Sequence, residues 1–389
     1  MGLYFNDIKN HKYSKIVILG LPIFIGAVLG GIILGILSLE KQEIKLDEFA
    51  LGKGTSTKFS EIGGFQIHCQ DLTDLEKCEQ GYFQSNMKNV ILWLGNSQIH
   101  SINQMQLDDE TAAPILHRHF KNLNYYFLTF SQPNANLQEH YLLFEYLLDS
   151  FPIKILVLPV VFDDMRETGI RPSLEMAFSN AKLTERLKKT KIGKELLANF
   201  GEKDSAGNDM TAIADTLQES MEKQLNDKLA EHSVIWAKRS EIRGRIFLFL
   251  YKLRNFVFNI NPSTIRKIIQ GRYLKNIDAF KAIIDVAISN NIKVLVYIVP
   301  LRYDVPIPYK IDQYQMFKQD IKLLSEKDGV RFINLEKIIS NKLWGTKEST
   351  TLGGGLEYDY MHFKGEGHRM LAKSLIKELS TLLNKGNSQ

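Results

Sequence analysis

The sequence predicts an α/β protein whose main domain contains a parallel sheet covered by helices on both faces. Short apolar runs rich in strand-forming residues recur along the chain. Amphipathic stretches with helical spacing lie between these runs. Strands that alternate with helices form parallel sheets, because each crossover helix returns the chain to the same edge of the sheet.

Composition restricts the function only broadly. A chain of 389 residues, 44% of them hydrophobic, can bury one large core. The formal net charge is +5, and the basic residues are interleaved with acidic ones instead of forming one block. Nucleic-acid binding is therefore not predicted.

The first element is an uncharged apolar run from Ile16 to Leu39, which predicts a transmembrane helix. Roughly 20 residues are enough to cross a bilayer core of about 30 Å. The apolar core of a cleavable signal peptide is shorter, about 7–15 residues, so we expect this segment to remain as an anchor. Three lysines precede it, which places residues 1–15 in the cytoplasm and the rest of the chain outside, in the periplasm or at the cell surface.

Residues 40–64 are polar and contain glycine and serine, which predicts a stalk between the membrane and a domain spanning residues 65–389. Cys69 and Cys78 lie close together in this exterior part, where an oxidising environment favours a disulfide. Two separate thiols are the alternative. His68 adds a third candidate metal ligand, but the spacing is not that of a regular zinc site, so no metal is predicted.

Within the domain, short apolar runs enriched in β-branched and aromatic residues predict the strands. They are Asn89–Leu94, Tyr125–Phe130, Ile153–Val161, Ile292–Val299 and Val330–Asn334. Amphipathic stretches predict helices at Leu137–Leu148, Asn276–Ser289 and, closing the domain, Gly367–Leu383.

The alternation of strands and helices stops between about residues 165 and 275, where a long charged region predicts a helical insertion. Within it, Arg243–Ile260 combines large apolar residues with four basic ones. This composition is typical of a helix that lies on an anionic membrane surface or in a partner's groove. A core helix with basic ends explains it equally well.

The first candidate site is Gly95-Asn96-Ser97, directly after the strand Asn89–Leu94. It lies where a strand turns into a helix, at the carboxyl edge of the predicted sheet, where ligands usually bind. A serine at this turn exposes its hydroxyl, and the nearby backbone N–H groups point towards a developing oxyanion. Gly-Asn-Ser is also ordinary turn and cap chemistry, so the motif alone does not identify a nucleophile.

The second candidate site is Asp359-x-x-His362, shortly before the closing helix. A serine hydroxyl needs a base, and the imidazole needs an acceptor on its other nitrogen. An aspartate three residues before a histidine on one loop can provide both. We therefore predict Ser97 as nucleophile, His362 as base and Asp359 as the residue that orients it. His368 competes for the role of base, but its place at the start of the helix predicts a cap or surface residue.

Together these motifs resemble the SGNH, or GDSL-like, hydrolase superfamily. Its members carry Gly-Asp-Ser after the first strand and Asp-x-x-His before the last helix of a flavodoxin-like sheet. Here Gly-Asn-Ser replaces Gly-Asp-Ser and the serine is intact. The resemblance covers residues 89–164 and 292–383. It implies a flavodoxin-like parallel sheet and a covalent acyl-enzyme on Ser97, without a cofactor.

Two further blocks of this superfamily are less regular in the chain. Asn134 occupies the position of the glycine whose N–H normally enters the oxyanion hole, and asparagine tolerates positive φ better than most residues. Asp163 occupies the position of an asparagine donor. A carboxylate accepts hydrogen bonds and does not donate them unless protonated, so we expect a weakened or reorganised oxyanion hole. Asn96 is assigned to the same oxyanion or substrate-binding group.

With its single anchor, exterior domain and helical insertion, the chain resembles the SGNH proteins that work beside membrane-bound O-acyltransferases. The D-alanyl transfer protein of teichoic acid synthesis and the alginate acetylation proteins are examples. The resemblance implies a serine acyltransferase or esterase acting on acyl esters of a cell-envelope polysaccharide or polymer, with such an acyltransferase as partner. The alternative is a catalytically degenerate scaffold or glycan-binding subunit, in which Asn134 and Asp163 mark lost activity.

Overall fold

The computed structural model describes residues 54–205 and 239–384. Residues 239–254 belong to a separate compact unit, and the other described residues form the main unit. The predicted cytoplasmic segment 1–15 and the predicted span Ile16–Leu39 lie outside the described residues. Among the helices that are described, none combines the length and the hydropathy needed to cross a bilayer.

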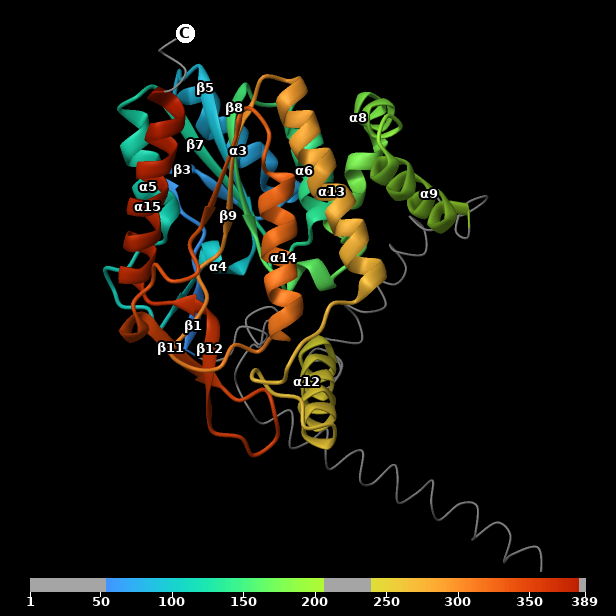
Figure 1. Cartoon of the computed structure of the whole chain (residues 1–389), viewed down its shortest axis with the longest axis vertical. Coiled ribbons are helices and arrows are strands. Elements are labelled where there is room, and N and C mark those ends of the chain that lie inside the picture. The colour runs from blue at the N-terminus through green and yellow to red at the C-terminus, as the bar shows by residue number, and fades with distance from the viewer. Residues whose placement is uncertain (1–53, 206–238, 385–389) are drawn as a thin grey trace, which may run out of the picture. The chain divides into compact units, whose positions relative to one another are not determined.

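The main unit is built on a six-stranded parallel sheet (Figure 1). Every neighbouring pair in the order β10-β9-β8-β5-β7-β4 is parallel. The strands are β4 (His68–Cys69), β5 (Asn89–Gly95), β7 (Tyr125–Ser131), β8 (Ile153–Val160), β9 (Lys293–Ile298) and β10 (Val330–Asn334). The predicted α/β class and each predicted strand are therefore confirmed. Strand β4 was missed because two residues are too short to show a pattern.

Helices cover both faces of the sheet (Figure 1). They are α3 (Leu75–Gln84), α5 (Ala112–Lys121), α6 (Leu137–Leu147), α13 (Gln270–Ser289), α14 (Ile311–Leu324) and α15 (Gly365–Asn384). Alternate residues of β5 belong to two different core clusters. Val90 and Leu92 pack in the cluster that includes residues of α6, α13 and α14, and Ile91 and Trp93 pack in the cluster of α5 and α15. Burial on both faces explains why the strands are continuous apolar runs.

The folded part begins earlier than the predicted boundary at residue 65. β1 (Thr55–Thr57) pairs antiparallel with β6 (Ser101–Asn103), and β2 (Glu61–Ile62) pairs with β3 (Phe65–Gln66). Ser60, inside the predicted stalk 40–64, is buried and shares a 3.0 Å hydrogen bond with Thr111. Small polar residues suggested a linker. Ser60 can nevertheless be buried, because its hydroxyl is hydrogen-bonded to Thr111.

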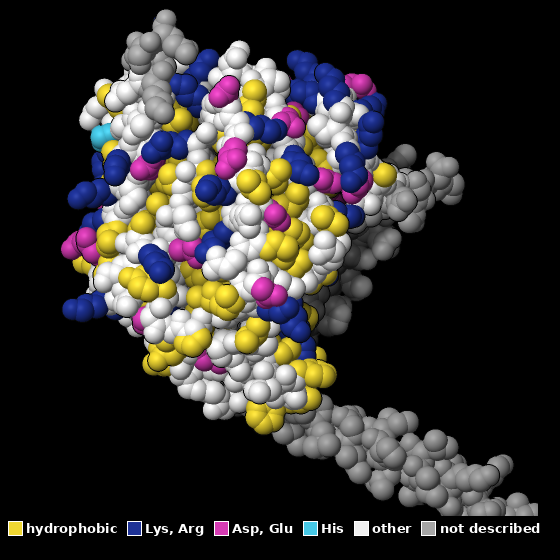
Figure 2. All heavy atoms as spheres, viewed as in Figure 1, with side chains coloured by type: hydrophobic (Ala, Val, Ile, Leu, Met, Phe, Trp, Pro, Cys, Tyr) yellow, Lys and Arg dark blue, Asp and Glu magenta, His cyan; other side chains and the backbone are white. Residues whose placement is uncertain are grey.

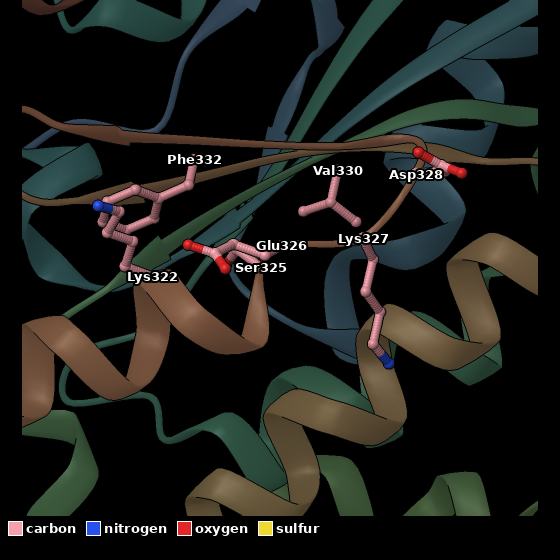
Figure 3. Close-up of a pocket in the computed structure, with 7 residues that line it drawn as sticks. All are labelled: Lys322, Ser325, Glu326, Lys327, Asp328, Val330 and Phe332. Atoms are coloured by element: carbon pink, nitrogen blue, oxygen red, sulfur yellow. The ribbon is translucent and has the colours of Figure 1, made fainter.

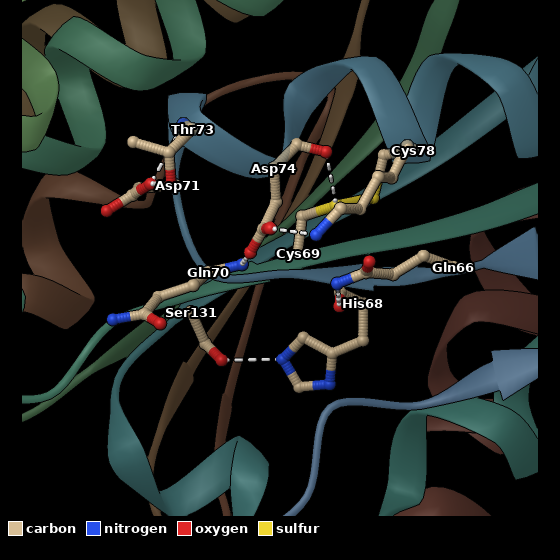
Figure 4. Close-up of a disulfide and its surroundings, with 10 residues drawn as sticks. Gln66, His68, Cys69, Gln70, Asp71, Thr73, Asp74, Cys78 and Ser131 are labelled. Atoms are coloured by element: carbon tan, nitrogen blue, oxygen red, sulfur yellow. Dashed lines mark hydrogen bonds and ion pairs between the residues drawn. A yellow bond between two sulfur atoms is a disulfide. The ribbon is translucent and has the colours of Figure 1, made fainter. Parts of the chain in front are cut away.

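Cys69 and Cys78 form a disulfide that joins β4 to α3 (Figure 4). The neighbouring His68 takes no part in it. The His68 ring is hydrogen-bonded at 2.6 Å to the hydroxyl of Ser131, at the end of β7. The disulfide thus fixes the short edge strand to the helix that follows it.

All regular elements described between Asp164 and Val257 are helical. They are η2 (Asp164–Arg166), α7 (Pro172–Glu175), η3 (Met176–Ser179), α8 (Ala181–Leu187), α9 (Lys191–Ser205) and α12 (Arg239–Val257). In α12, which lies largely in the separate unit, Phe247, Phe249 and Leu250 are exposed. On the face of the molecule seen in Figure 2, basic and acidic side chains are interspersed.

Candidate active site

Ser97 is the first residue of α4 (Ser97–His100), immediately after β5. The side-chain oxygen of Asn96 caps this short helix by accepting a 3.1 Å hydrogen bond from the N–H of Gln98. A Cβ atom at position 95 would lie 1.9 Å from the side chain of Ile99. A side chain at this position would force the buried Ile99 to move, so Gly95 allows close packing here, although its φ is not in the positive range.

Ser97, His362 and Asp359 form a continuous hydrogen-bonded series. The Ser97 hydroxyl oxygen lies 3.0 Å from Nε2 of His362, and Nδ1 of His362 lies 2.9 Å from a carboxylate oxygen of Asp359. If Nδ1 carries the proton and donates a hydrogen bond to the carboxylate, Nε2 is free to accept a hydrogen bond from the serine hydroxyl. His362 and Asp359 are buried, and Ser97 remains partly accessible.

The two C-terminal members lie in a strand and not on the predicted loop. β12 (Leu356–Phe363) pairs antiparallel with β11 (Trp344–Glu348). Thr346 is opposite Tyr358 and Trp344 is opposite Phe363, so the four residues 359–362 bulge opposite a single residue of β11. Residues three apart in a regular strand point to opposite faces, and the bulge lets Asp359 and His362 meet.

The Asp359 carboxylate is held by several donors besides the imidazole. One oxygen accepts from the backbone N–H groups of Met361 and His362, each at 3.0 Å. The other accepts from the side chains of Asn103 at 3.2 Å and Thr55 at 3.4 Å. Burial opposes ionisation, but the attraction of His362 and its hydrogen bonds outweighs burial and lowers the pKa of Asp359. The carboxylate therefore stays charged at neutral pH.

Gln98 connects the serine to the base. Its side-chain amide donates 2.8 Å hydrogen bonds to the carbonyl oxygens of Pro300 and Met361. Met361 directly precedes His362, so this buried side chain ties α4 to both β12 and the segment after β9. Its position directly after the Gly-Asn-Ser motif gave no indication of this role.

Asn134 and Ser97 both line the same cavity. Asn134 has a φ of +52°, the left-handed conformation expected from the sequence. Neither backbone N–H is hydrogen-bonded within the described residues. Both groups are therefore available to a negatively charged oxygen near the Ser97 hydroxyl.

Asp163 contributes no donor to the cavity that it lines. Its carboxylate accepts a 2.9 Å hydrogen bond from the hydroxyl of Tyr309 and forms an ion pair with the guanidinium of Arg266. Arg166 lies 3.6 Å from its other oxygen. The carboxylate therefore acts as an acceptor between two arginines, at the position where the resemblance places a neutral donor.

Asp164, which the sequence did not single out, is buried and accepts a 2.7 Å hydrogen bond from the side-chain amide of Asn96. Burial raises the pKa of Asp164 well above its ordinary value. Both polar atoms of the Asn96 side chain thus have partners in the fold. The geometry gives Asn96 a positioning role beside the serine. Asn96 also lines the cavity, and its amide has a second N–H, so a contact with an oxyanion or substrate stays a prediction.

His368 is not the cap or surface residue that its place in the sequence suggested. It is fully buried, and its Nε2 is hydrogen-bonded to the carbonyl oxygen of Ser101 at 3.0 Å. Two more buried histidines, His68 and His100, share the hydroxyl of Ser131 at 2.6 and 2.7 Å. Burial lowers the pKa of all three histidines. They are packed inside the fold, and the hydrogen bonds of their rings go to other partners than Ser97.

The Ser97 hydroxyl faces a cavity of about 160 Å³ at the carboxyl edge of the sheet. A larger, more open hollow of about 520 Å³ lies between the end of α14 and the start of β10 (Figure 3). Its lining includes Lys322, Ser325 and Phe332 but contains no histidine. It also lies at the amino end of β10, away from the edge where parallel sheets bind ligands. The cavity at Ser97 is therefore the better candidate.

No protein-family model matches the sequence, and a search of curated proteins also finds no match.

Proposed function

We propose that the chain is a serine acyltransferase or esterase of the SGNH type that acts on acyl esters of a cell-envelope polymer. The observation that supports this most directly is the hydrogen-bonded series Ser97, His362 and Asp359 in a cavity at the carboxyl edge of a parallel sheet. Nucleophile, base and orienting carboxylate are the groups that acyl transfer through a covalent intermediate requires.

The first half-reaction forms the acyl-enzyme. Ser97 attacks the carbonyl carbon of the ester while Nε2 of His362 takes the hydroxyl proton. The tetrahedral intermediate then breaks its bond to the alcohol oxygen, and His362 returns the proton to that oxygen. Asp359 remains ionised and stabilises the imidazolium.

The second half-reaction releases the acyl group. A hydroxyl of the acceptor polymer, or water, attacks the acyl carbon and gives its proton to His362. The bond to the Ser97 oxygen breaks, and the serine recovers its proton from the imidazolium. A polymer acceptor makes the protein a transferase, and water makes it an esterase.

The backbone N–H groups of Ser97 and Asn134 would stabilise the oxyanion in both halves. With a carboxylate at position 163, the side-chain donor expected from the resemblance is missing. Removing one such donor typically lowers the rate by about 10²–10³-fold. We therefore expect slow turnover of simple esters.

We further propose that the protein is anchored by Ile16–Leu39 with its domain outside the cytoplasm, beside a membrane-bound O-acyltransferase. The uncharged run and the lysines before it support the anchor and its orientation. The Cys69–Cys78 disulfide supports an oxidising compartment.

A second candidate function is a catalytically inactive scaffold or glycan-binding subunit of a membrane acylation complex. The observation that favours it is the pairing of Asp163 with Arg266 and Tyr309, which fills the expected donor position with an ion pair. The triad geometry favours the enzyme.

An active-site fluorophosphonate probe separates the two functions. We expect covalent labelling at Ser97, located by mass spectrometry, and loss of the label in Ser97→Ala and His362→Ala. Ser340→Ala, which changes an exposed serine outside the cavity, serves as the matched control. If the folded wild-type protein takes up no label while a known serine esterase in the same sample does, the scaffold function is supported instead.

A further inference from the structure

Two basic side chains line the cavity at Ser97, Lys347 on β11 and Arg266. They differ in how their charge is balanced. Arg266 forms an ion pair with Asp163 and also donates to the carbonyl oxygen of Pro262. Within the described residues, the ammonium of Lys347 makes no hydrogen bond or ion pair.

The cross-strand neighbour of Lys347 does not neutralise it. Glu357 is directly opposite Lys347 in the β11–β12 pair. The Glu357 carboxylate instead accepts a 2.7 Å hydrogen bond from the hydroxyl of Ser349. A half-buried ammonium in the wall of a confined cavity, with no ion pair among the described residues, attracts anions into that cavity.

The position of Lys347 indicates which part of an ester it would meet. The carbonyl oxygen must lie near the N–H groups of Ser97 and Asn134, whereas the departing alcohol oxygen must lie near Nε2 of His362, which protonates it. Lys347 lies on the strand that is paired with the strand of His362, and its charge reaches Asp359, the hydrogen-bond partner of His362, where it lowers the pKa of the carboxyl group. The alcohol part of the ester, or the incoming acceptor in the second half-reaction, is therefore the part beside Lys347.

We infer that Lys347 is a specificity-determining residue that binds an anionic group, a carboxylate or a phosphate, on the alcohol part of the ester. This inference rests on the proposed acyl-transfer function. An ammonium that only favoured the ionised form of Asp359 would instead act equally on charged and neutral substrates, because every substrate uses the same triad.

The test compares kcat/KM for three aryl esters that differ in the place of the charge. 4-Acetoxybenzoate carries a carboxylate on the alcohol part, 4-acetoxybenzamide is its neutral counterpart, and the hemisuccinate ester of 4-hydroxybenzamide carries the charge on the acyl part. In Lys347→Gln we expect kcat/KM for 4-acetoxybenzoate to fall about 10-fold, as for loss of one hydrogen bond to a charged group. The values for the other two esters should change less than about two-fold.

Lys347→Glu should lower the rate with 4-acetoxybenzoate further, and Lys347→Arg should retain most of it. Lys342→Gln removes the same charge from an exposed position outside the cavity and should leave all three rates unchanged. A uniform loss with all three esters in Lys347→Gln would overturn the inference and leave the proposed function intact. A selective loss with the hemisuccinate would also overturn it, by placing the anion on the acyl part.

If the wild-type protein hydrolyses none of the esters, fluorophosphonate labelling of Ser97 still tests the proposed function separately. Binding of 4-acetoxybenzoate, followed by ligand-observed NMR, then decides the inference. Binding to the wild type that is weakened about 10-fold in Lys347→Gln supports an anion site. Equal or absent binding in the two proteins contradicts it.

Discussion

The side-chain amide of Asn96 donates a 2.7 Å hydrogen bond to the buried carboxylate of Asp164. Asn96 precedes the candidate nucleophile, and Asp164 opens the first helical turn after β8. The bond therefore fixes the cap of α4 to the neighbouring strand's end. Because the same asparagine also caps α4, a displacement at Asp164 would be transmitted directly to Ser97.

Removing the acceptor at position 164 should harm both stability and reactivity. In Asp164→Ala the buried amide of Asn96 loses its partner, which costs about 1–3 kcal/mol in the free energy of unfolding. A misplaced Ser97 should also react more slowly with the fluorophosphonate probe, by about 10-fold or more, since a shift of about 1 Å can cost 10²-fold. Urea unfolding and labelling rates provide the two measurements.

Asp164→Asn is the matched variant, because its side-chain oxygen can still accept from Asn96. Burial raises the pKa of Asp164, so a neutral side chain suits this position. We expect a labelling rate within about three-fold of the wild type. A loss as large as that of the alanine variant would show that the negative charge itself is needed.

The central strands of the sheet could be predicted because each has a local sequence signal. β5, β7, β8 and β9 are buried on both faces, so each appears as an apolar run that needs no knowledge of its neighbours. Strand β4 shows the limit of this reasoning. Its two residues pair with Thr129 and Phe130 of β7 and have no pattern of their own.

The residues that support the site were not predictable in the same way. The order of Ser97, Asp359 and His362 along the chain was informative, because each motif carries a chemically distinctive residue. Asn103 and Thr55 contact Asp359 only because β1 pairs with β6 and places both side chains beside β12. Such contacts depend on long-range pairing, which no local spacing encodes.

If Ser97, His362 and Asp359 act as a unit, their substitutions should not be additive. Ser97→Ala, His362→Ala and the double variant should show the same residual ester hydrolysis, since a second loss in a broken unit changes little. Asp359→Asn should fold and yet lose about 10⁴-fold in kcat, because the imidazole is then held in the wrong tautomer. Steady-state kinetics with circular dichroism as the folding control tests both expectations. Additive losses would show that the residues act independently.

Buried histidines should make the fold sensitive to acid. Burial lowers the pKa of His68 and His140 to about 3 and that of His368 to about 4, from an ordinary value of 6.5. Between pH 6.5 and about 4 the unfolded chain binds protons at these sites and the folded protein does not, so stability falls as pH falls. Each histidine should remove about 1.4 kcal/mol between pH 7.5 and 5.5.

Urea unfolding at the two pH values measures this loss. His368→Gln retains a donor for the carbonyl oxygen of Ser101 and should reduce the pH-dependent loss by about 1.4 kcal/mol. His119→Gln changes an exposed histidine and should leave the pH dependence unaltered. An unchanged dependence in His368→Gln would show that this histidine is already protonated in the folded protein near pH 5.5.

The proposed orientation in the membrane can be tested with single cysteines. Glu61→Cys introduces an exposed thiol in the folded domain and should react with an impermeant maleimide on intact cells. Asn6→Cys, in the predicted cytoplasmic segment, should react only after lysis. The reverse pattern would contradict an extracytoplasmic domain and any action on envelope polymers.

The Asp163→Asn variant tests whether Asp163 is a degenerate oxyanion residue or a carboxylate with a role of its own. From the resemblance alone, Asp163→Asn would restore a donor and leave activity unharmed or raise it. In the structure, however, the carboxylate pairs with Arg266 and accepts from Tyr309. An amide there leaves the guanidinium without a counter-charge, so we expect a loss of about 1.5–3 kcal/mol in stability, as for a hydrogen bond to a charged group, and lower activity.

A double-mutant cycle isolates this pair. Arg266→Gln alone should also destabilise the protein, and adding it to Asp163→Asn should cost little more, because it then removes a guanidinium that has already lost its counter-charge. Urea unfolding gives the coupling free energy, and ester hydrolysis gives the activity of each variant. A more active Asp163→Asn protein with unchanged stability would contradict the paired role, and it would return position 163 to the oxyanion hole expected from the sequence.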